Sequence, residues 1–259
     1  MVNSYDMKNY LITSLLFLSL GFSQKEYNYN DIIEMNNGLW TEKFSDKPIT
    51  GKVYGYFGEV QPLKKVYMGN LLKGKKEGRW TRWFNNGRKS SKGFYKNGEI
   101  DGLVTEWYEN GQKSYEGTWK DGKKDGLSTI WYKNGNKRLE ITYKNGKQDG
   151  LVTQWHENGQ KKSEETYKDG ERDGLYTSWY DNGQKNDEII YKDGNKDGLW
   201  TEWYENGQKD LEGTYKDGKL DGFFTYWYKN GQKESEKTFK DGKLISRKNW
   251  NEDGTVKND

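Results

Sequence analysis

The chain has 259 residues, of which 43 are basic and 40 acidic, and its mean hydropathy is -1.26. A hydrophobic fraction of 31% is typical of a disordered chain, but 12 Trp and 20 Tyr placed in register are not. Acidic and basic residues are interleaved, so no basic face for nucleic acid is expected. Cysteine is absent, which excludes disulfides, thiolate metal sites and cysteine nucleophiles.

The first predicted element is a targeting segment at residues 1–23. One lysine precedes an apolar run from Leu11 to Phe22, and the small residue Ser23 follows. This is the pattern of a Sec-type signal peptide cleaved after Ser23. About a dozen apolar residues are fewer than the roughly 20 that cross a bilayer. The sequence therefore predicts an exported protein, periplasmic or secreted; the alternative is a short uncleaved anchor helix.

Two atypical segments follow the targeting segment. Residues 24–50 have short apolar pairs on either side of an Asn36-Asn37-Gly38 turn, which predicts an N-terminal capping hairpin. Residues 51–77 resemble a degenerate copy of the repeat described next, with about three extra residues near Pro62, which cannot donate to a strand ladder. Terminal repeats of an array usually differ because one of their faces has no neighbour.

A 24-residue repeat dominates the rest of the chain. Seven copies fill residues 78–245 without a slip, each opened by a glycine such as Gly102. Within a copy, two strand-like runs are separated by Asn-Gly and Asp-Gly turns, which are strong hairpin signals. The predicted fold class is therefore all-β: an elongated antiparallel β-hairpin repeat array, an open meander or solenoid-like single sheet. Residues 246–259 are expected to form a C-terminal cap and tail.

The length of the Asn-Gly turn determines which side chains share a face. A two-residue loop exchanges odd and even positions at each turn, whereas a three-residue loop preserves them through the chain. We expect three-residue loops such as Glu109-Asn110-Gly111, because they segregate apolar and polar residues better. The predicted apolar face then holds Leu103, Thr105, Trp107, Tyr115, Gly117 and Trp119. The predicted polar face holds Glu106, Gln112, Ser114, Glu116, Thr118 and Lys120, together with Val104 and Tyr108.

This register predicts two parallel aromatic columns on the apolar face. The first column is Trp83, Trp107, Trp131, Trp155, Trp179, Trp203 and Trp227. The second column is Tyr95, Trp119, Tyr143, Tyr167, Tyr191, Tyr215 and Phe239. Each Trp is expected to lie across from a lysine and near a turn glycine such as Gly87, because rings that cover glycines and lysine stems beside them stabilise a sheet with little aliphatic core.

Candidate chemical residues have simpler structural explanations. His156 stands where the other copies have Tyr or Phe, so we expect a structural ring there and not a catalytic one. The recurring Asp-Gly pairs could line a cation site, but a turn role is favoured because Lys124 and Arg172 lie beside them in sequence. A repeated Glu column gives no acid and base with different surroundings. We therefore predict no catalytic residue, metal site or cofactor, and no enzyme.

The aromatic residues are the candidate binding groups. Trp and Tyr along a sheet either pack against each other or form a platform for sugars, choline-like cations or a partner strand. We expect packing for the two columns. The candidate binding surface is the set of rings at the position of His156, namely Tyr108, Tyr132, His156, Tyr180, Tyr204 and Tyr228.

The units GLVTEWYENGQK, GLWTEWYENGQK and EGTYKDGKLDG resemble the MORN-repeat-variant family, whose bacterial members include YwqK-type antitoxins of toxin–antitoxin systems. The resemblance covers residues 51 to about 254. It implies a β-hairpin array that acts through protein contacts, with no catalytic residues to carry over. Relatives of ordinary MORN type are linked to membranes, but the interleaved charges here argue against membrane association after signal cleavage.

The sequence predicts a non-enzymatic exported repeat protein that binds another protein, with an antitoxin or immunity role as one version. The partner is expected to be a toxin or an envelope protein, and nucleic acid is not expected. The alternative is a carbohydrate or cell-envelope binding module that uses the Trp and Tyr columns.

Overall fold

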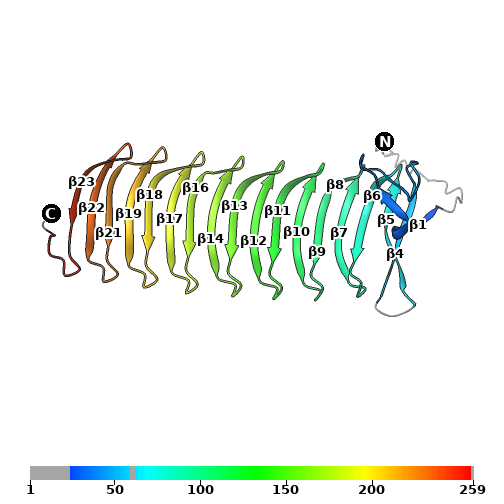
Figure 1. The fold of residues 1–259 in the computed structure, drawn as a ribbon, viewed down its shortest axis with the longest axis horizontal. Coiled ribbons are helices and arrows are strands. Elements are labelled where there is room, and N and C mark those ends of the chain that lie inside the picture. Colours follow the sequence, from blue (N-terminus) through cyan, green and yellow to red (C-terminus); the bar gives the residue numbers. More distant parts are fainter. Residues whose placement is uncertain (1–23, 59–61, 258–259) are drawn as a thin grey trace, which may run out of the picture.

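The computed structural model describes residues 24–58 and 62–257, and the predicted signal peptide at residues 1–23 lies outside them. The described chain forms a long single row of strands (Figure 1). These strands make a 21-stranded sheet and a separate two-stranded sheet. The predicted all-β hairpin array is confirmed. Within the described ranges, no helix is long and apolar enough to cross a membrane.

The elements fall into an N-terminal region, seven copies and a final strand. The N-terminal region contains β1 (Glu26–Asn28), the 3-10 helix η1 (Tyr29–Asp31), β2 (Ile32–Glu34), β3 (Trp40–Glu42), β4 (Gly51–Phe57) and β5 (Lys64–Leu72). The first three copies contain β6 (Lys75–Trp83), β7 (Lys89–Lys96), β8 (Glu99–Ile100), β9 (Gly102–Trp107), β10 (Lys113–Lys120), β11 (Lys123–Trp131) and β12 (Lys137–Lys144). The next two contain β13 (Lys147–Trp155), β14 (Lys161–Lys168), β15 (Glu171–Arg172), β16 (Gly174–Trp179) and β17 (Lys185–Lys192). The last two contain β18 (Asn195–Trp203), β19 (Lys209–Lys216), β20 (Lys219–Leu220), β21 (Gly222–Trp227) and β22 (Lys233–Lys240), and β23 (Lys243–Asn249) follows.

Neighbouring strands of the chain are neighbours in the sheet. From β4 to β23 the pairing is antiparallel, and the short strands β8, β15 and β20 are the first segments of strands that continue as β9, β16 and β21. β1 adds to β4 in the parallel direction. The sheet is open, with β1 at one end and β23 at the other (Figure 1).

The Asn-Gly turns have the predicted three-residue loop. The N–H of Tyr108 donates to the carbonyl of Gln112 at 2.8 Å, and the N–H of Gly111 donates to the carbonyl of Tyr108 at 2.9 Å. Gly111 has a φ of 92°, a left-handed conformation that glycine adopts without steric cost. Glu109, Asn110 and Gly111 therefore form a type I turn closed by a glycine bulge.

A second bulge directly after the turn changes the register. Trp107 pairs with Lys113, as the three-residue loop requires, but Glu106 pairs with Tyr115. Ser114 is thus an extra residue on its strand, and beyond it the ladder joins odd positions to even ones. The same shift recurs in the other six copies.

The predicted division into faces is therefore wrong beyond this bulge. Val104 pairs with Gly117 and Thr118 pairs with Leu103, and paired side chains point to the same face. Val104 is buried with the second aromatic column, whereas Leu103 is 52% exposed on the opposite face. The residues expected together are split into Leu103, Thr105 and Trp107 on one face and Tyr115, Gly117 and Trp119 on the other.

The Asp-Gly turns also differ from the parity-preserving loops that were expected. Lys120 pairs with Lys123, which leaves a two-residue loop of Asp121 and Gly122. Their φ values are 48° and 74°, the left-handed pair that a type I′ turn requires. In both hairpins of a copy, an odd-numbered residue therefore pairs with an even-numbered one across the central part of the strands. Two such changes cancel over one copy, so each face holds the same repeat positions in every copy.

Aromatic rings cover strand glycines, but they are not the predicted rings. The rings of Trp80 and Phe224 lie where a Cβ on Gly69 and Gly213 would project. A Cβ on the turn glycine Gly87 would meet nothing within 4 Å, so no Trp of the first column covers it. The rings instead belong to a position between the two predicted columns, and they cover the facing strand.

The N-terminal region covers the first end of the array. Tyr27, Ile32, Trp40 and Ile49 pack with residues of β4, β5 and β6, namely Val53, Met68, Leu71 and Trp80. The ammonium group of Lys76 lies 5.2 Å from the Trp40 ring and 5.4 Å from the Trp80 ring. This aliphatic and aromatic cluster gives the end of the sheet a packed neighbour, as a terminal repeat requires.

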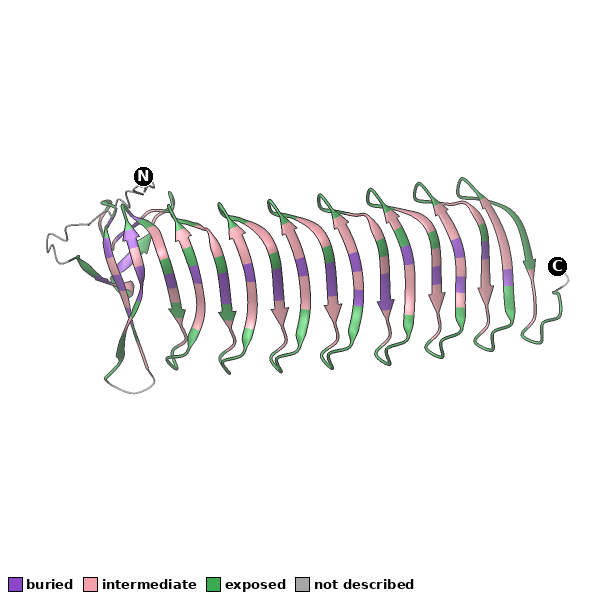
Figure 2. Cartoon of the chain, turned by 180° about the vertical axis from the view of Figure 1, so that it is seen from behind, coloured by how far each residue is buried: buried purple, intermediate pink, exposed green. Residues whose placement is uncertain are grey.

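Burial within the copies is confined to the middle of the strands (Figure 2). Phe224, Ile189 and Leu211 are at most 4% exposed, and on the opposite face Thr201 is also buried. Full burial of a large apolar side chain contributes about 1.5 to 3 kcal/mol, so these central positions account for much of the stability of a single layer.

Candidate binding face

The corrected register gives the sheet two faces of different character. We call one the ladder face; in the copy that begins at Gly102 it holds Leu103, Thr105, Trp107, Lys113, Glu116 and Thr118. We call the other the variable face; in the same copy it holds Val104, Glu106, Tyr115, Gly117 and Trp119. Equivalent positions of the other copies are included in each name.

The ladder face is a repeated set of polar contacts. Lys113 Nζ lies 2.6 Å from Glu116 Oε2 and 5.6 Å from the ring centroid of Trp131 in the next copy. Thr105 Oγ1 donates to the same Glu116 oxygen at 3.3 Å. Equivalent Lys–Glu pairs occur in the next five copies. The prediction that lysines lie beside the first Trp column is confirmed, and the contact links one copy to the next.

The two predicted aromatic columns lie on opposite faces. The first, from Trp83 to Trp227, lies on the ladder face, and Trp250 after β23 takes the next place, 5.8 Å from Lys233 Nζ. The second, from Tyr95 to Phe239, lies on the variable face beside the variable residues. The expectation that the columns run side by side is wrong, because the bulge after each Asn-Gly turn separates them.

The predicted candidate surface residues link neighbouring copies. Tyr108 Oη donates to the main-chain carbonyl of Trp131 at 2.6 Å, 23 residues further along. The same bond is made by Tyr132, Tyr180, Tyr204 and Tyr228, to Trp155, Trp203, Trp227 and Trp250. These rings are half-buried, and their hydroxyl groups are already used within the protein. We call these contacts the tyrosine links.

His156 interrupts the tyrosine links. Its Nδ1 lies 2.9 Å from Asp181 Oδ1, and its Nε2 is buried without a hydrogen-bond partner. The shorter ring therefore contacts a side chain of the next turn in place of the Trp179 carbonyl. A structural position was predicted for His156, and the copy in which it stands is one of the two that line the pocket described below.

Differences between the copies are concentrated on the variable face. Thr and Trp recur in all seven copies on the ladder face, as at Thr177 and Trp179. On the variable face, the position of Tyr176 holds Trp, Val, Ser, Val, Tyr, Trp and Phe along the chain, and that of Glu165 holds Gly, Gly, Ile, Glu, Ile, Gly and Lys. The positions of Ser178, Asp187 and Arg172 vary as widely. The repeated residues thus build one face, and the residues that distinguish the copies occupy the other.

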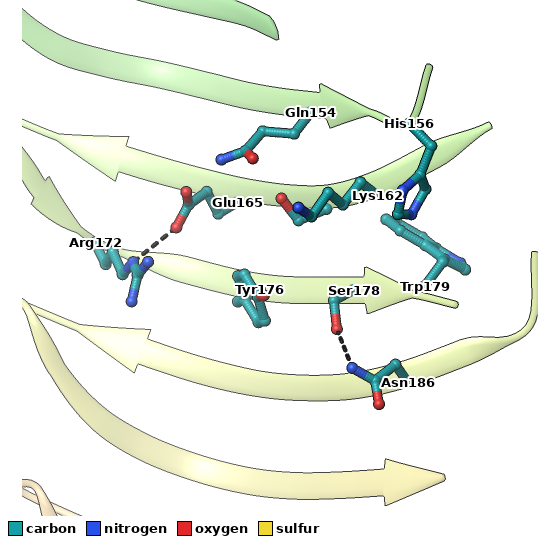
Figure 3. Close-up of a pocket in the computed structure, with 10 residues that line it drawn as sticks. Gln154, His156, Lys162, Glu165, Arg172, Tyr176, Ser178, Trp179 and Asn186 are labelled. Atoms are coloured by element: carbon teal, nitrogen blue, oxygen red, sulfur yellow. Dashed lines mark hydrogen bonds and ion pairs between the residues drawn. The ribbon is translucent and has the colours of Figure 1, made fainter. Parts of the chain in front are cut away.

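A polar pocket of about 250 Å³ lies in the middle of the variable face (Figure 3). It spans β13 to β17, and its lining includes His156, Lys162, Glu165, Arg172, Tyr176 and Ser178. Lys162 and Asn186 are bulge residues, and Asn186 Nδ2 donates to Ser178 Oγ at 3.2 Å. The bulge that changes the register therefore also directs these side chains toward the variable face.

An ion pair forms the floor of the pocket. The Nε of Arg172 donates to Glu165 Oε2 at 2.7 Å, and the Glu165 side chain is 7% exposed (Figure 3). The guanidinium group also lies 5.6 Å from the ring of Tyr176 and 5.2 Å from that of Tyr191. Burial alone would lower the pKa of Arg172, but a hydrogen bond with Tyr167 and the charge of Glu165 raise it. The Arg172 guanidinium is therefore charged at neutral pH.

Two carboxyl groups extend this polar region along the array. Trp200 Nε1 donates to Asp187 Oδ1 at 2.7 Å, and Asp187 pairs with Glu202 across the strands. Burial raises the pKa of Asp187, and burial followed by the charges of Asp187 and Asp210 raises the pKa of Glu202. Within residues 24–58 and 62–257, no three His, Asp or Glu side chains are grouped to hold a metal ion.

The fold and these two faces define an open single-sheet β-repeat protein. Repeat proteins of this class suggest a binding module. The family model for the MORN repeat variant matches seven segments, residues 76–97, 100–121, 124–145, 148–169, 172–193, 196–217 and 220–241. Because these segments cover more than half of the chain, the chain belongs to the MORN repeat variant family. A search of curated proteins gives no significant match.

Sequence reasoning placed His156 of the pocket lining on the candidate binding surface but missed the charged residues beside it. Glu165, Arg172 and Tyr176 were not among the predicted binding residues, which were drawn from the recurring rings. The available signal was the comparison of copies, because Glu165 stands between Ile141 and Ile189 at the same repeat position. A charged residue at a place that is apolar in both flanking copies indicates a role outside the scaffold.

Proposed function

We propose that this chain is a non-enzymatic repeat protein that binds a protein partner through its variable face. The observation that carries the proposal is the distribution of differences between the copies. A scaffold requires the same residues in every copy, whereas a surface that recognises one particular partner requires different residues along its length. No catalytic residue, metal or cofactor forms part of the proposal.

The ladder face supports this choice of surface. Its charged groups are paired with each other, as Lys113 is with Glu116, and its Trp rings have lysine ammonium groups beside them. The variable face has partly exposed rings, carboxyl groups whose pKa is raised by burial, and a pocket. His156 Nε2, which lines the pocket and is buried without a hydrogen-bond partner, would gain from a complementary group of a bound protein, since an unpaired buried polar group is costly.

Capture by the mature chain, followed by two matched variants, tests the proposal. The lysate comes from cells that express the chain. The first variant of the full chain carries Arg138→Glu and Lys162→Glu, which replace two exposed bulge residues at the variable face. The control carries Leu151→Ser and Leu175→Ser, which change exposed side chains of the ladder face. We expect a discrete partner that is lost with the first variant and kept with the second. Equal capture by both, or no partner, contradicts the proposal.

The predicted export and the family label refine this proposal. We place the chain in the periplasm or outside the cell, with an envelope protein or an exported toxin as its partner and an immunity role as one version. The support is the charge and apolar pattern of residues 1–23. Cell fractionation and the mass of the mature chain test it. A cytoplasmic chain that retains residues 1–23 would contradict it.

Binding of glycans on the aromatic columns is the second candidate. It rests on the regular spacing of the Trp rings, one in each copy. The lysine ammonium groups lie 5.5 to 5.8 Å from these ring centroids, so a sugar would have to displace them. Retention on insoluble glycan that is lost with Trp131→Ala and Trp203→Ala would favour this candidate.

A further inference from the structure

Among the residues that the structure describes, the last strand of the sheet has a free edge. β23 pairs with β22 on one side. The ladder begins where Lys243 pairs with Lys240 and ends where Asn249 pairs with Ser235. In an antiparallel pair, alternate residues direct their N–H and C=O groups away from the partner strand. Residues 243–248 are all exposed, in contrast to the central strands. An edge of this kind is a template for a further strand.

The two ends of the sheet differ in how they are closed. At the N-terminal end, β1 and the hairpin of β2 and β3 contribute to a packed apolar cluster. At the other end, the tail returns only to the end of β23: Trp250 bridges to Val256, and the N–H of Lys257 donates to the carbonyl of Asn249 at 2.9 Å. Within the described part of the chain, no strand pairs with the edge of residues 243–248 that faces away from β22.

The chemistry of the edge indicates which kind of strand it accepts. Residues 243–249 read KLISRKN, with three cations, Lys243, Arg247 and Lys248, and no carboxylate. Leu244 and Ile245 are 52% and 65% exposed. Pairing of two copies through this edge would bring six cations into one strand pair, and lysines at an edge oppose such pairing. Charge complementarity therefore favours a segment that carries carboxylates together with aliphatic side chains.

We propose that β23 binds an extended acidic segment of a partner protein as an additional strand of the sheet. Main-chain hydrogen bonds would supply affinity. Carboxylates beside the cations, which lie on both faces of β23 because Arg247 and Lys248 are consecutive, and aliphatic side chains beside Leu244 and Ile245 would supply selectivity. The inference concerns a surface separate from the variable face, so it can fail while the proposed function holds.

Three peptides test the inference on the full chain. The first alternates Glu and Val over nine residues, the second alternates Lys and Val, and the third is the first with proline at its centre, which removes a ladder hydrogen bond. Fluorescence anisotropy measures binding, and hydrogen exchange locates it. We expect only the first peptide to bind tightly and to protect amides of residues 243–249. Binding of all three, or protection elsewhere, would overturn the inference.

A charge-reversed edge provides the matched variant. Lys243→Glu, Arg247→Glu and Lys248→Glu change exposed side chains, and the circular dichroism spectrum and melting temperature check that the array remains folded. The preference should reverse, with the Glu-Val peptide at least tenfold weaker and the Lys-Val peptide bound in its place. An unchanged preference would contradict the inference. So would sedimentation of the unaltered chain as a dimer that protects the same amides, because a second copy would then occupy the edge.

Discussion

The hydroxyl group of Tyr204 donates a hydrogen bond of 2.7 Å to the main-chain carbonyl of Trp227, one copy further along the array. Asn206 Nδ2 makes a second bond of the same kind, 2.9 Å to the carbonyl of Lys229. In both contacts, the donor lies at the Asn-Gly turn of one copy and the acceptor lies at or next to the corresponding turn of the following copy. In a repeat protein, stability is approximately a sum of the repeats and of the interfaces between neighbours, so these bonds belong to the interface term.

Tyr204→Phe should therefore destabilise the array near its turn. The change removes the donor and leaves the Trp227 carbonyl without its partner, at a cost of about 1 kcal/mol. Urea unfolding, with hydrogen exchange at the turns, measures the effect. His156→Tyr is the converse variant, since it offers the missing hydroxyl to Trp179, and it should stabilise by a similar amount. Equal stability of Tyr204→Phe and the unaltered chain would show that the bond is not needed.

Alkaline pH should unfold the chain. Burial raises the pKa of Tyr176, Tyr204 and Tyr215. Above the ordinary tyrosine pKa of about 10, the unfolded chain loses these protons while the folded chain keeps them, so stability falls as pH rises. Unfolding measured between pH 8 and pH 11 should show this decline, and Tyr204→Phe should make it shallower. Stability that rises over the same interval would contradict the assignment.

Glycine at the centre of the variable face should be required only where a ring covers it. A Cβ at Gly213 would overlap the Phe224 ring, whereas a Cβ at the equivalent Gly93 would lie 3.4 Å from the nearest atom, on Val104. Gly213→Ala should cost about 1 to 3 kcal/mol through overpacking. Gly93→Ala should cost clearly less, as thermal unfolding of both variants would show. Equal losses would indicate that the ring moves freely.

Glu165→Ile should leave the fold intact. Its neighbours along the array, Ile141 and Ile189, hold isoleucine at the same position. Removing one partner of a buried ion pair is costly when the remaining charge stays buried, but the Arg172 side chain is 41% exposed, so water can solvate its charge once Glu165 is replaced. Urea unfolding should give a change of less than about 1 kcal/mol or a gain. A loss of several kcal/mol would mean that the ion pair serves stability and not recognition.

The repeat period and the Asn-Gly turns could be predicted because they depend on local chemistry. Asn and Gly at Asn110 and Gly111 favour one backbone conformation whatever surrounds them. The bulge could not be predicted in the same way. The bulge is imposed by pairing between strands, and the residues that occupy it share polarity but neither charge nor size: Ser90, Ser114, Arg138, Lys162, Asn186, Asp210 and Glu234.

The variable face illustrates the consequence of that missing information. Without the bulge, Val104 was placed among polar residues and Leu103 with Tyr115, so no single face collected the differences between copies. Once the register is known, the positions of Tyr176, Ser178 and Asp187 fall on one side of the sheet. The candidate residues were present in the sequence, but their common face depended on one residue of register.

The affinity of the captured partner for the two face variants tests the central claim most directly. Titration calorimetry with the full chain compares two double variants. One carries Arg138→Glu and Lys162→Glu at the variable face, and the other carries Leu151→Ser and Leu175→Ser at the ladder face. The account predicts a Kd at least tenfold weaker for the first pair of changes and within twofold of the unaltered chain for the second. The reverse order would contradict the assignment of the variable face as the binding surface.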